Sequence, residues 1–245
     1  MLGLPDQVTA CLFDLDGVLT RTAVVHDAAW AQVFDDFLRS RASAAGTAFV
    51  PFDRDEDYNL YVDGRPRADG VRTFLASRGI TLPEGSPDDP PTAQTVHGLG
   101  NRKNVVLLDV IHRDGVQAYQ GSVRYLHAAR DAGLRRAVVS ASANCAEVLA
   151  AAGISDLLEV RVDGVVAAAE GLRGKPEPDT FLAAARRLGV EPERAAVFED
   201  AVAGVQAGRA GGFGAVVGVD RVDHADELRA GGASIVVKDL SELLE

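Results

Sequence analysis

The sequence predicts an α/β fold, with a parallel sheet covered by helices on both faces and a helical insert after the first strand. Three observations support this. From about residue 122 onward, strand-like and helix-like segments alternate. The stretch from about residue 20 to residue 118 shows helical periodicity without convincing strands. Apolar residues make up 47% of the 245 residues, which is enough to bury a full core.

The first element is a short buried strand at residues 8–13, which ends at Asp14. In the second half of the chain we expect three helices, at residues 144–152, 180–188 and 201–210. We also expect strands at residues 136–140, 195–198, 214–219 and 234–237. Such an alternation builds βαβ units and therefore a parallel sheet.

The insert is predicted to contain helices at residues 27–42, 71–77 and 104–112, with a proline-rich loop at residues 82–91. One face of the first helix is apolar through Trp30, Val33, Phe34, Phe37 and Leu38. An insert at this point of the chain would lie above the carboxyl ends of the strands, where open α/β sheets bind their ligands. We therefore expect it to form a lid over the site.

Composition excludes several classes of function. The formal charge is -11, from 36 acidic and 25 basic residues, so we do not expect a nucleic-acid partner. The N-terminus lacks a basic stretch followed by an apolar one, and no apolar run reaches membrane-spanning length. We therefore expect a cytoplasmic protein without a membrane partner. Cys11 and Cys145 are expected to be buried free thiols, and no cysteine–histidine cluster suggests zinc.

Four short motifs contain the candidate functional residues. They are Asp14-Leu15-Asp16-Gly17, Ser140-Ala141-Ser142, Lys175-Pro176 and Glu199-Asp200. Three of them stand where a predicted apolar strand ends. In a parallel sheet those ends share one edge, so we expect the motifs to converge on one pocket.

Phosphoryl transfer needs residues of these types. An anionic nucleophile is repelled by a phosphate unless positive charge screens it. Mg²⁺ prefers carboxylate, carbonyl and water oxygens, which Asp14, the main-chain carbonyl of Asp16, and Asp200 can supply, with Glu199 close by. Lys175 would place a fixed cation on the phosphate.

The remaining groups would complete the reaction. The Ser140 hydroxyl and nearby N–H groups offer neutral donors to the phosphate. Asp14 can attack phosphorus and form an aspartyl phosphate, while Asp16 can donate a proton to the leaving oxygen and later take one from the acceptor. Each motif alone also has an ordinary structural explanation, such as a turn, a helix cap or a solvated lysine. Their order and their places at strand ends favour the phosphoryl-transfer site.

The chain resembles the haloacid dehalogenase superfamily, which contains these four motifs in this order, and within it the β-phosphoglucomutase family. The matching residues are Asp14-Leu15-Asp16-Gly17-Val18, Thr22, His26, Trp30, Arg102-Lys103-Asn104, Ser140-Ala141-Ser142-Ala143-Asn144, Lys175-Pro176-Glu177-Pro178-Asp179 and Glu199-Asp200-Ala201. The resemblance implies a Rossmann-like core of residues 1–20 and 118–245, with an α-helical cap at residues 21–117.

The resemblance also implies roles for individual residues. Asp14 would be the nucleophile and Asp16 the general acid and base, and both would join Glu199 and Asp200 in a Mg²⁺ site. The transferring phosphate would be bound by Ser140, Ala141 and Lys175. The substrate, a small sugar phosphate, would be contacted by His26, Arg67, Lys103, Ser142 and Asn144. His26 would also help to position Asp16, and we expect the protein to be a monomer.

The predicted cap departs from the family pattern in two ways. It is longer, around residues 42–61 and again around residues 82–95. The family's Gly-x-x-Arg substrate loop is matched only by Gly64-Arg65-Pro66-Arg67. The departures concern sugar specificity and leave the core motifs intact.

Several activities compete within this superfamily. The expected one is a hexose-phosphate mutase that converts β-glucose 1-phosphate to glucose 6-phosphate. A dehalogenase has no need of a second aspartate, so Asp16 argues against it. A phosphonatase needs an early cap lysine, and the chain has none before Lys103. A sugar-phosphate phosphatase remains as the alternative. A non-catalytic sugar-phosphate sensor would be expected to lose one of the reactive carboxylates, and all are present.

Overall fold

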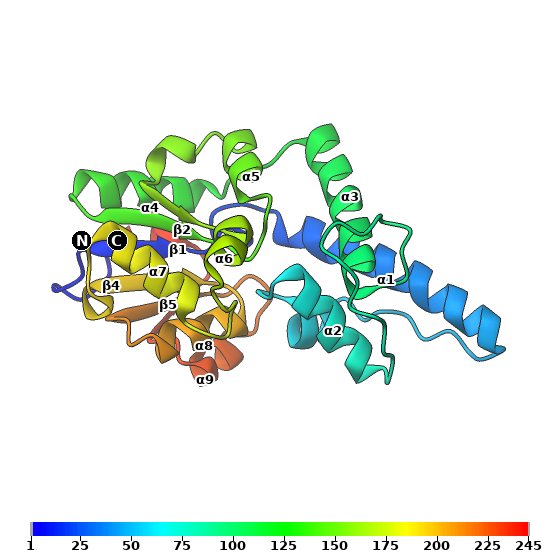
Figure 1. Ribbon diagram of the computed structural model, residues 1–245. Coiled ribbons are helices and arrows are strands. Elements are labelled where there is room, and N and C mark those ends of the chain that lie inside the picture. The colour runs from blue at the N-terminus through cyan, green and yellow to red at the C-terminus, as the bar shows by residue number, and fades with distance from the viewer. Residues whose placement is uncertain (1, 245) are drawn as a thin grey trace. The chain divides into compact units, whose positions relative to one another are not determined.

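The computed structural model describes residues 2–244, which form two compact units (Figure 1). The first unit contains the chain up to Thr22 and from Val116 onward. The second unit is the intervening segment, Ala23–Gly115. The candidate core motifs all fall in the first unit.

A six-stranded, all-parallel sheet forms the centre of the first unit. Its strands are β1 (Ala10–Phe13), β2 (Arg135–Val139), β3 (Val160–Val162), β4 (Ala195–Glu199), β5 (Ala215–Val219) and β6 (Ile235–Val237). Their order is β3-β2-β1-β4-β5-β6, so the order reverses between β1 and β4. Phe13 pairs with Phe198 across this switch point, and the motifs that follow both strands are therefore neighbours.

Helices connect the strands of this unit. They are α4 (Gln120–Asp131), α5 (Cys145–Ala151), α6 (Gly164–Glu170), α7 (Asp179–Leu188), α8 (Val202–Ala210) and α9 (Ala225–Gly231). Short 3₁₀ turns occupy Ser155–Leu157, Pro192–Arg194 and Leu240–Leu244. None of the helices formed by residues 2–244 is both long and apolar enough to cross a bilayer.

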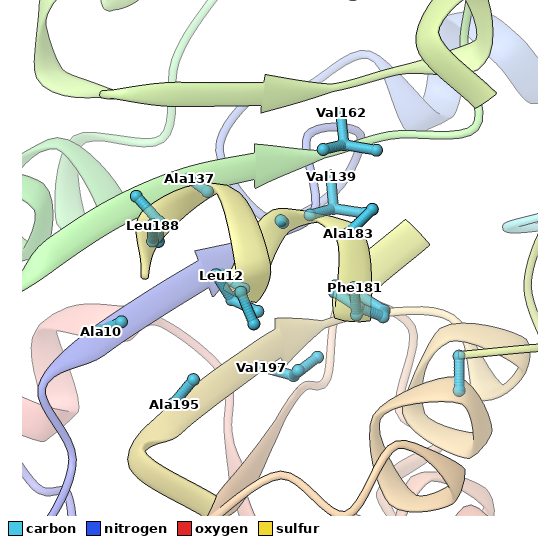
Figure 2. Packing of buried hydrophobic residues seen from close by; sticks show 13 residues of the cluster. Ala10, Leu12, Ala137, Val139, Val162, Phe181, Ala183, Leu188, Ala195 and Val197 are labelled. Carbon is cyan, nitrogen blue, oxygen red and sulfur yellow. The ribbon is translucent and has the colours of Figure 1, made fainter. Parts of the chain in front are cut away.

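The sheet is buried on both faces. Leu12 of β1 belongs to a buried cluster with Val197 of β4 and with Phe181 and Leu188 of α7, as Figure 2 shows. On the opposite face, the Phe13 ring packs edge-on against Tyr125 of α4, with ring centroids 6.2 Å apart. Because successive residues of a strand point to opposite faces, burial on both sides requires the continuous apolar run seen in β1. The predicted α/β, Rossmann-like fold class is confirmed.

The second unit is helical, and its described residues contain no strand. Its helices are α1 (Ala23–Ala45), α2 (Arg67–Ser77) and α3 (Val96–Asp114), with one π-helical turn at Tyr58–Val62. An aromatic cluster joins them, in which the Phe34 ring lies 4.2 Å from that of Phe74 and 4.9 Å from that of Trp30. The apolar face predicted for the first helix of the insert is buried in this cluster.

Some elements extend beyond the sequence-based expectation or were missing from it. Helix α3 begins eight residues earlier than predicted. Its first turns contain Gly98 and Gly100, and glycine lowers the helix propensity on which the prediction depended. Both glycines make close contacts: an added Cβ would lie 2.5 Å from the Ala93 carbonyl oxygen at Gly98, and 3.1 Å from Arg67 at Gly100. Strand β3 and helices α4, α6 and α9 were not among the predicted elements; α4 has 12 residues, and the other three have seven or fewer.

Candidate active site

Three carboxylates meet at the carboxyl ends of β1 and β4. Asp14 follows β1, Glu199 ends β4, and Asp200 comes next. One oxygen from each lies within 4.8 Å of the others, and all three residues are buried. The main-chain N–H of Asp14 donates to the Phe198 carbonyl over 2.9 Å, which ties the end of β1 to β4. The sheet register therefore brings together the carboxylates that the sequence separates.

Lys175 places a buried cation among these carboxylates. Its ammonium lies 2.5 Å from Asp14 Oδ1 and also donates to Glu199 Oε1. Burial lowers the pKa of Lys175, but the charges of Asp14 and Glu199 outweigh that effect and raise its pKa overall. Burial raises the pKa of Asp14, Lys175 opposes that rise, and the Glu199 and Asp16 charges add to it. A further positive charge at the site would therefore stabilise the ionised form of these carboxylates.

Two glycines make room for the carboxylates. Gly17 has a φ of +89°, and a Cβ on it would lie 1.6 Å from Asp200 Oδ2. Gly204 is the second case, because a Cβ there would lie 1.9 Å from Glu199 Oε1 in the first turns of α8. Only glycine fits at either position without moving a carboxylate.

Asp16 is joined to a short chain of hydroxyl groups. The Thr22 hydroxyl donates to Asp16 Oδ1, and the Thr20 hydroxyl lies 2.7 Å from that of Thr22. Thr20 Oγ1 is also 3.1 Å from the Leu15 carbonyl oxygen. Each hydroxyl can donate one hydrogen bond and accept others. The two threonines can therefore donate toward an ionised Asp16, or, when Asp16 is protonated and donates, they can donate in the opposite direction. The arrangement can therefore hold Asp16 in place in either protonation state.

The loop after β2 is folded by its own serines. Ser140 Oγ accepts from the Ser142 N–H over 3.0 Å, and Ser142 Oγ accepts from the Asn144 N–H over 3.2 Å. Ser140 is 2% exposed, and its main-chain N–H donates to the Val162 carbonyl of β3. A Cβ on Gly164 would lie 2.8 Å from the Ala141 carbonyl oxygen, so the start of α6 packs closely on this loop.

The donor set suits a divalent cation. Carboxylate oxygens are the ligands that Mg²⁺ prefers, and cysteine or histidine is absent from the cluster of Asp14, Glu199 and Asp200. When all three carboxylates are ionised, their charge of -3 and the +1 of Lys175 sum to -2. A divalent cation would neutralise that remainder. The Asp16 side chain is not part of the cluster, which leaves its main-chain carbonyl as the group expected to bind metal.

The second unit contains the other predicted substrate residues. Lys103 of α3 is 4% exposed, and its ammonium lies 3.0 Å from His26 Nδ1 and 5.2 Å from the centroid of the Trp30 ring. An ammonium group can only donate, so Nδ1 of His26 accepts. Arg67 begins α2 and donates to the Gly100 carbonyl over 3.4 Å, and burial lowers its pKa. These three side chains, two of them cationic, thus lie near the first half of α3.

Two neighbours of the carboxylates were missed from the sequence. Arg221 donates to the Gly17 carbonyl, and His224 lies within hydrogen-bonding distance of the Asp200 carbonyl. Both follow β5, so polar residues at one more strand end were the available signal. Asp163, which accepts from the N–H groups of Val165 and Val166 at the start of α6, was also missed, because the strand before it, β3, was not predicted.

Comparison with known proteins assigns the family. A model of haloacid dehalogenase-like hydrolases matches residues 8–212. The chain belongs to the haloacid dehalogenase-like family. All four core motifs lie inside the matched region, so the family's core is present in this chain.

Within the haloacid dehalogenase-like family, the chain groups with β-phosphoglucomutases. It is 56% identical to a β-phosphoglucomutase of Mycobacterium bovis, over all of this chain and 94% of that protein. It is 30% identical to a β-phosphoglucomutase of Bacillus subtilis, over 96% of this chain and 91% of the relative. The crystal structure of a β-phosphoglucomutase from Clostridium difficile has the same fold, with a TM-score of 0.73 and 24% identity over 96% and 93% of the two chains.

Proposed function

We propose that this protein is a hexose-phosphate mutase of the β-phosphoglucomutase type, which converts β-glucose 1-phosphate to glucose 6-phosphate. The observation that supports it most strongly is the grouping of Asp14 with Lys175, Glu199 and Asp200 in one buried cluster. That grouping supplies a nucleophile, a fixed cation and a set of oxygen ligands at one sheet edge. The 56% identity to a β-phosphoglucomutase supports a mutase over other phosphoryl-transfer enzymes.

In the proposed reaction Asp14 is the covalent nucleophile. Its carboxylate attacks the phosphorus of a glucose bisphosphate, the bond to the sugar oxygen breaks, and Asp14 becomes an aspartyl phosphate. Lys175 donates to the anionic oxygens of the phosphoryl group, and Ser140 and the loop at Ala141 supply further donors. A Mg²⁺ ion held by Asp14, the main-chain carbonyl of Asp16, and Asp200, with Glu199 close by, would supply charge neutralisation of that group.

Asp16 moves the protons. It gives a proton to the sugar oxygen that leaves phosphorus, and later takes one from the hydroxyl that attacks the aspartyl phosphate. The hydroxyl chain of Thr22 and Thr20 can hold Asp16 in both states, because the chain can reverse its direction. The sugar first bound as β-glucose 1-phosphate thus gains a phosphoryl group at O6, and the resulting bisphosphate returns its C1 phosphoryl group to Asp14.

The second unit is proposed to act as the cap. Lys103, His26 and Arg67 would contact the sugar or its second phosphate, and Ser142 and Asn144 would contact the substrate from the core unit. A cap that excludes water would favour the sugar hydroxyl as acceptor of the phosphoryl group. We further propose that the enzyme is a cytoplasmic monomer that binds a small sugar phosphate and has no nucleic-acid or membrane partner.

Product identity tests the proposal. Purified protein is given β-glucose 1-phosphate, Mg²⁺ and a trace of glucose 1,6-bisphosphate, and the products are separated. Glucose 6-phosphate is expected. If free phosphate and glucose appear instead, the mutase assignment fails and the sugar-phosphate phosphatase becomes the function. The matched control is Arg130→Met, an exposed α4 residue, which should leave the products unchanged.

A further inference from the structure

The loop after β5, residues 220–224, contacts the main chain of both carboxylate-bearing segments. Arg221 Nε donates to the Gly17 carbonyl oxygen over 2.8 Å. His224 Nε2 lies 3.0 Å from the Asp200 carbonyl oxygen. A carbonyl can only accept, so the hydrogen of His224 is on Nε2 and this nitrogen donates. One loop therefore binds the backbone next to Asp16 and the backbone of Asp200.

The Arg221 side chain is itself fixed from several sides. Its guanidinium carbon lies 3.6 Å from the centroid of the Tyr119 ring. Nη1 donates to the Lys238 carbonyl over 2.6 Å, and the side chain is 15% exposed. A planar guanidinium stacked on a ring and bonded at two nitrogens has little freedom to rotate. The donor to Gly17 is consequently held in one position.

The loop is also held in its own conformation. Asp220, which is 7% exposed, accepts from the main-chain N–H of His224 over 2.9 Å. Asp223 has a φ of +58°, a left-handed conformation that residues other than glycine seldom adopt. Such a conformation persists only where its surroundings enforce it. The loop thus has a defined shape that presents Arg221 and His224 to their carbonyl partners.

Gly17 and Asp200 are in tight contact, as the 1.6 Å spacing of a hypothetical Gly17 Cβ from Asp200 Oδ2 indicates. A small shift of either peptide would therefore displace the Asp200 carboxylate or the adjoining Asp16 carbonyl. We propose that Arg221 and His224 are positioning residues, which fix these two backbone segments and so keep the proposed metal and phosphoryl site formed before substrate binds. The inference rests on the proposed function for its effect on turnover, and on the proposed metal site for its effect on Mg²⁺ affinity.

Calorimetric titration of the full-length protein with Mg²⁺, without substrate, tests the proposal. Arg221→Met and His224→Leu each remove a donor, and we expect each to weaken Mg²⁺ binding by roughly tenfold, as is typical when a partner behind a metal ligand is lost. His224→Gln keeps an N–H donor and should stay close to the wild-type affinity. The Mg²⁺ affinity of Arg221→Lys should fall between that of Arg221→Met and that of the wild type. Arg229→Met on α9 is the matched control and should not change the affinity, because the exposed Arg229 side chain pairs with Asp226 of the same helix.

Steady-state kinetics at saturating Mg²⁺ provides a second readout. We expect kcat to fall in Arg221→Met and His224→Leu while KM for the sugar phosphate stays near the wild-type value, because neither side chain is placed against the sugar. Wild-type Mg²⁺ affinity and kcat in both variants would overturn the proposal, even with a lowered melting temperature. If Arg221→Met does not fold, the comparison of His224→Leu with His224→Gln decides alone. If wild-type protein shows no mutase activity but the Mg²⁺ affinities shift as expected, the proposed function fails and the positioning role stands.

Discussion

The ammonium of Lys175 lies 2.5 Å from Oδ1 of Asp14, the residue that follows the central strand β1. The same ammonium pairs with Glu199, and both its partners are buried. One cation thus compensates two buried carboxylates. This relationship explains how a carboxylate can be kept at an apolar strand end, and Lys175 would also screen the proposed attack of Asp14 on an anionic phosphoryl group.

Replacing Lys175 should destabilise the protein, because Lys175 offsets the repulsion between the Asp14 and Glu199 carboxylates. Lys175→Met leaves Asp14 and Glu199 buried without their shared cation, and we expect a loss of roughly 3–5 kcal/mol in the free energy of unfolding. Urea unfolding without metal measures the loss, and added Mg²⁺ should restore part of it. Stability equal to wild type in metal-free buffer would contradict the electrostatic explanation.

Asp14 is expected to be the phosphorylated residue. Asp14→Asn keeps the shape of the side chain but removes the nucleophilic carboxylate, so turnover should fall by roughly 10⁴-fold or more. Mass spectrometry of acid-quenched protein should find a phosphoryl group on Asp14 in the wild type and none in the variant. A variant that kept full turnover would remove Asp14 from the chemistry.

The Thr22 hydroxyl should support proton transfer by Asp16. Thr22→Val removes the donor to Asp16, and we expect kcat to fall by roughly ten- to a hundredfold, which is at most the low end of what general acid–base catalysis contributes, because Asp16 itself is kept. Thr22→Ser keeps the hydroxyl and is the matched control. Equal kcat values for the valine and serine variants would show that the hydroxyl has no such role.

The two cysteines should be unreactive in the folded protein. Cys11 and Cys145 are free and buried, and burial raises the pKa of both thiols. Since the thiolate is the reactive form, an aromatic disulfide reagent at pH 8 should modify neither thiol until denaturant is added, and both afterwards. Rapid reaction of either thiol in native buffer would show that its element opens readily.

The strand ends and their motifs could be predicted because the signals are local. An apolar run followed at once by Asp14, by Ser140 or by Glu199 is visible in the sequence, and parallel pairing then brings these residues to one edge. Strand β3 was not visible, since it has three residues and its central Arg161 is exposed. Helix α3 was shortened in the prediction, because Gly98 and Gly100 lower helix propensity while their tertiary contacts favour glycine.

The contacts of Arg221 could not be predicted for a different reason. Its partner Gly17 is 204 residues away in the sequence, and the hydrogen bond goes to a main-chain carbonyl. Any residue type has such a carbonyl, so no sequence pattern marks the partner. The same holds for His224 and the Asp200 carbonyl. Interactions of this kind become visible only when the sheet order and the loop conformations are known.

Transfer of the phosphoryl group to sugar rather than to water is the central claim, and ³¹P NMR in ¹⁸O-enriched water tests it most directly. Wild-type protein is supplied with β-glucose 1-phosphate, Mg²⁺ and a trace of glucose 1,6-bisphosphate. We expect the signal of the substrate to be replaced by that of glucose 6-phosphate, with no ¹⁸O in its phosphoryl group. Accumulation of inorganic phosphate containing ¹⁸O would contradict the claim and identify a phosphatase.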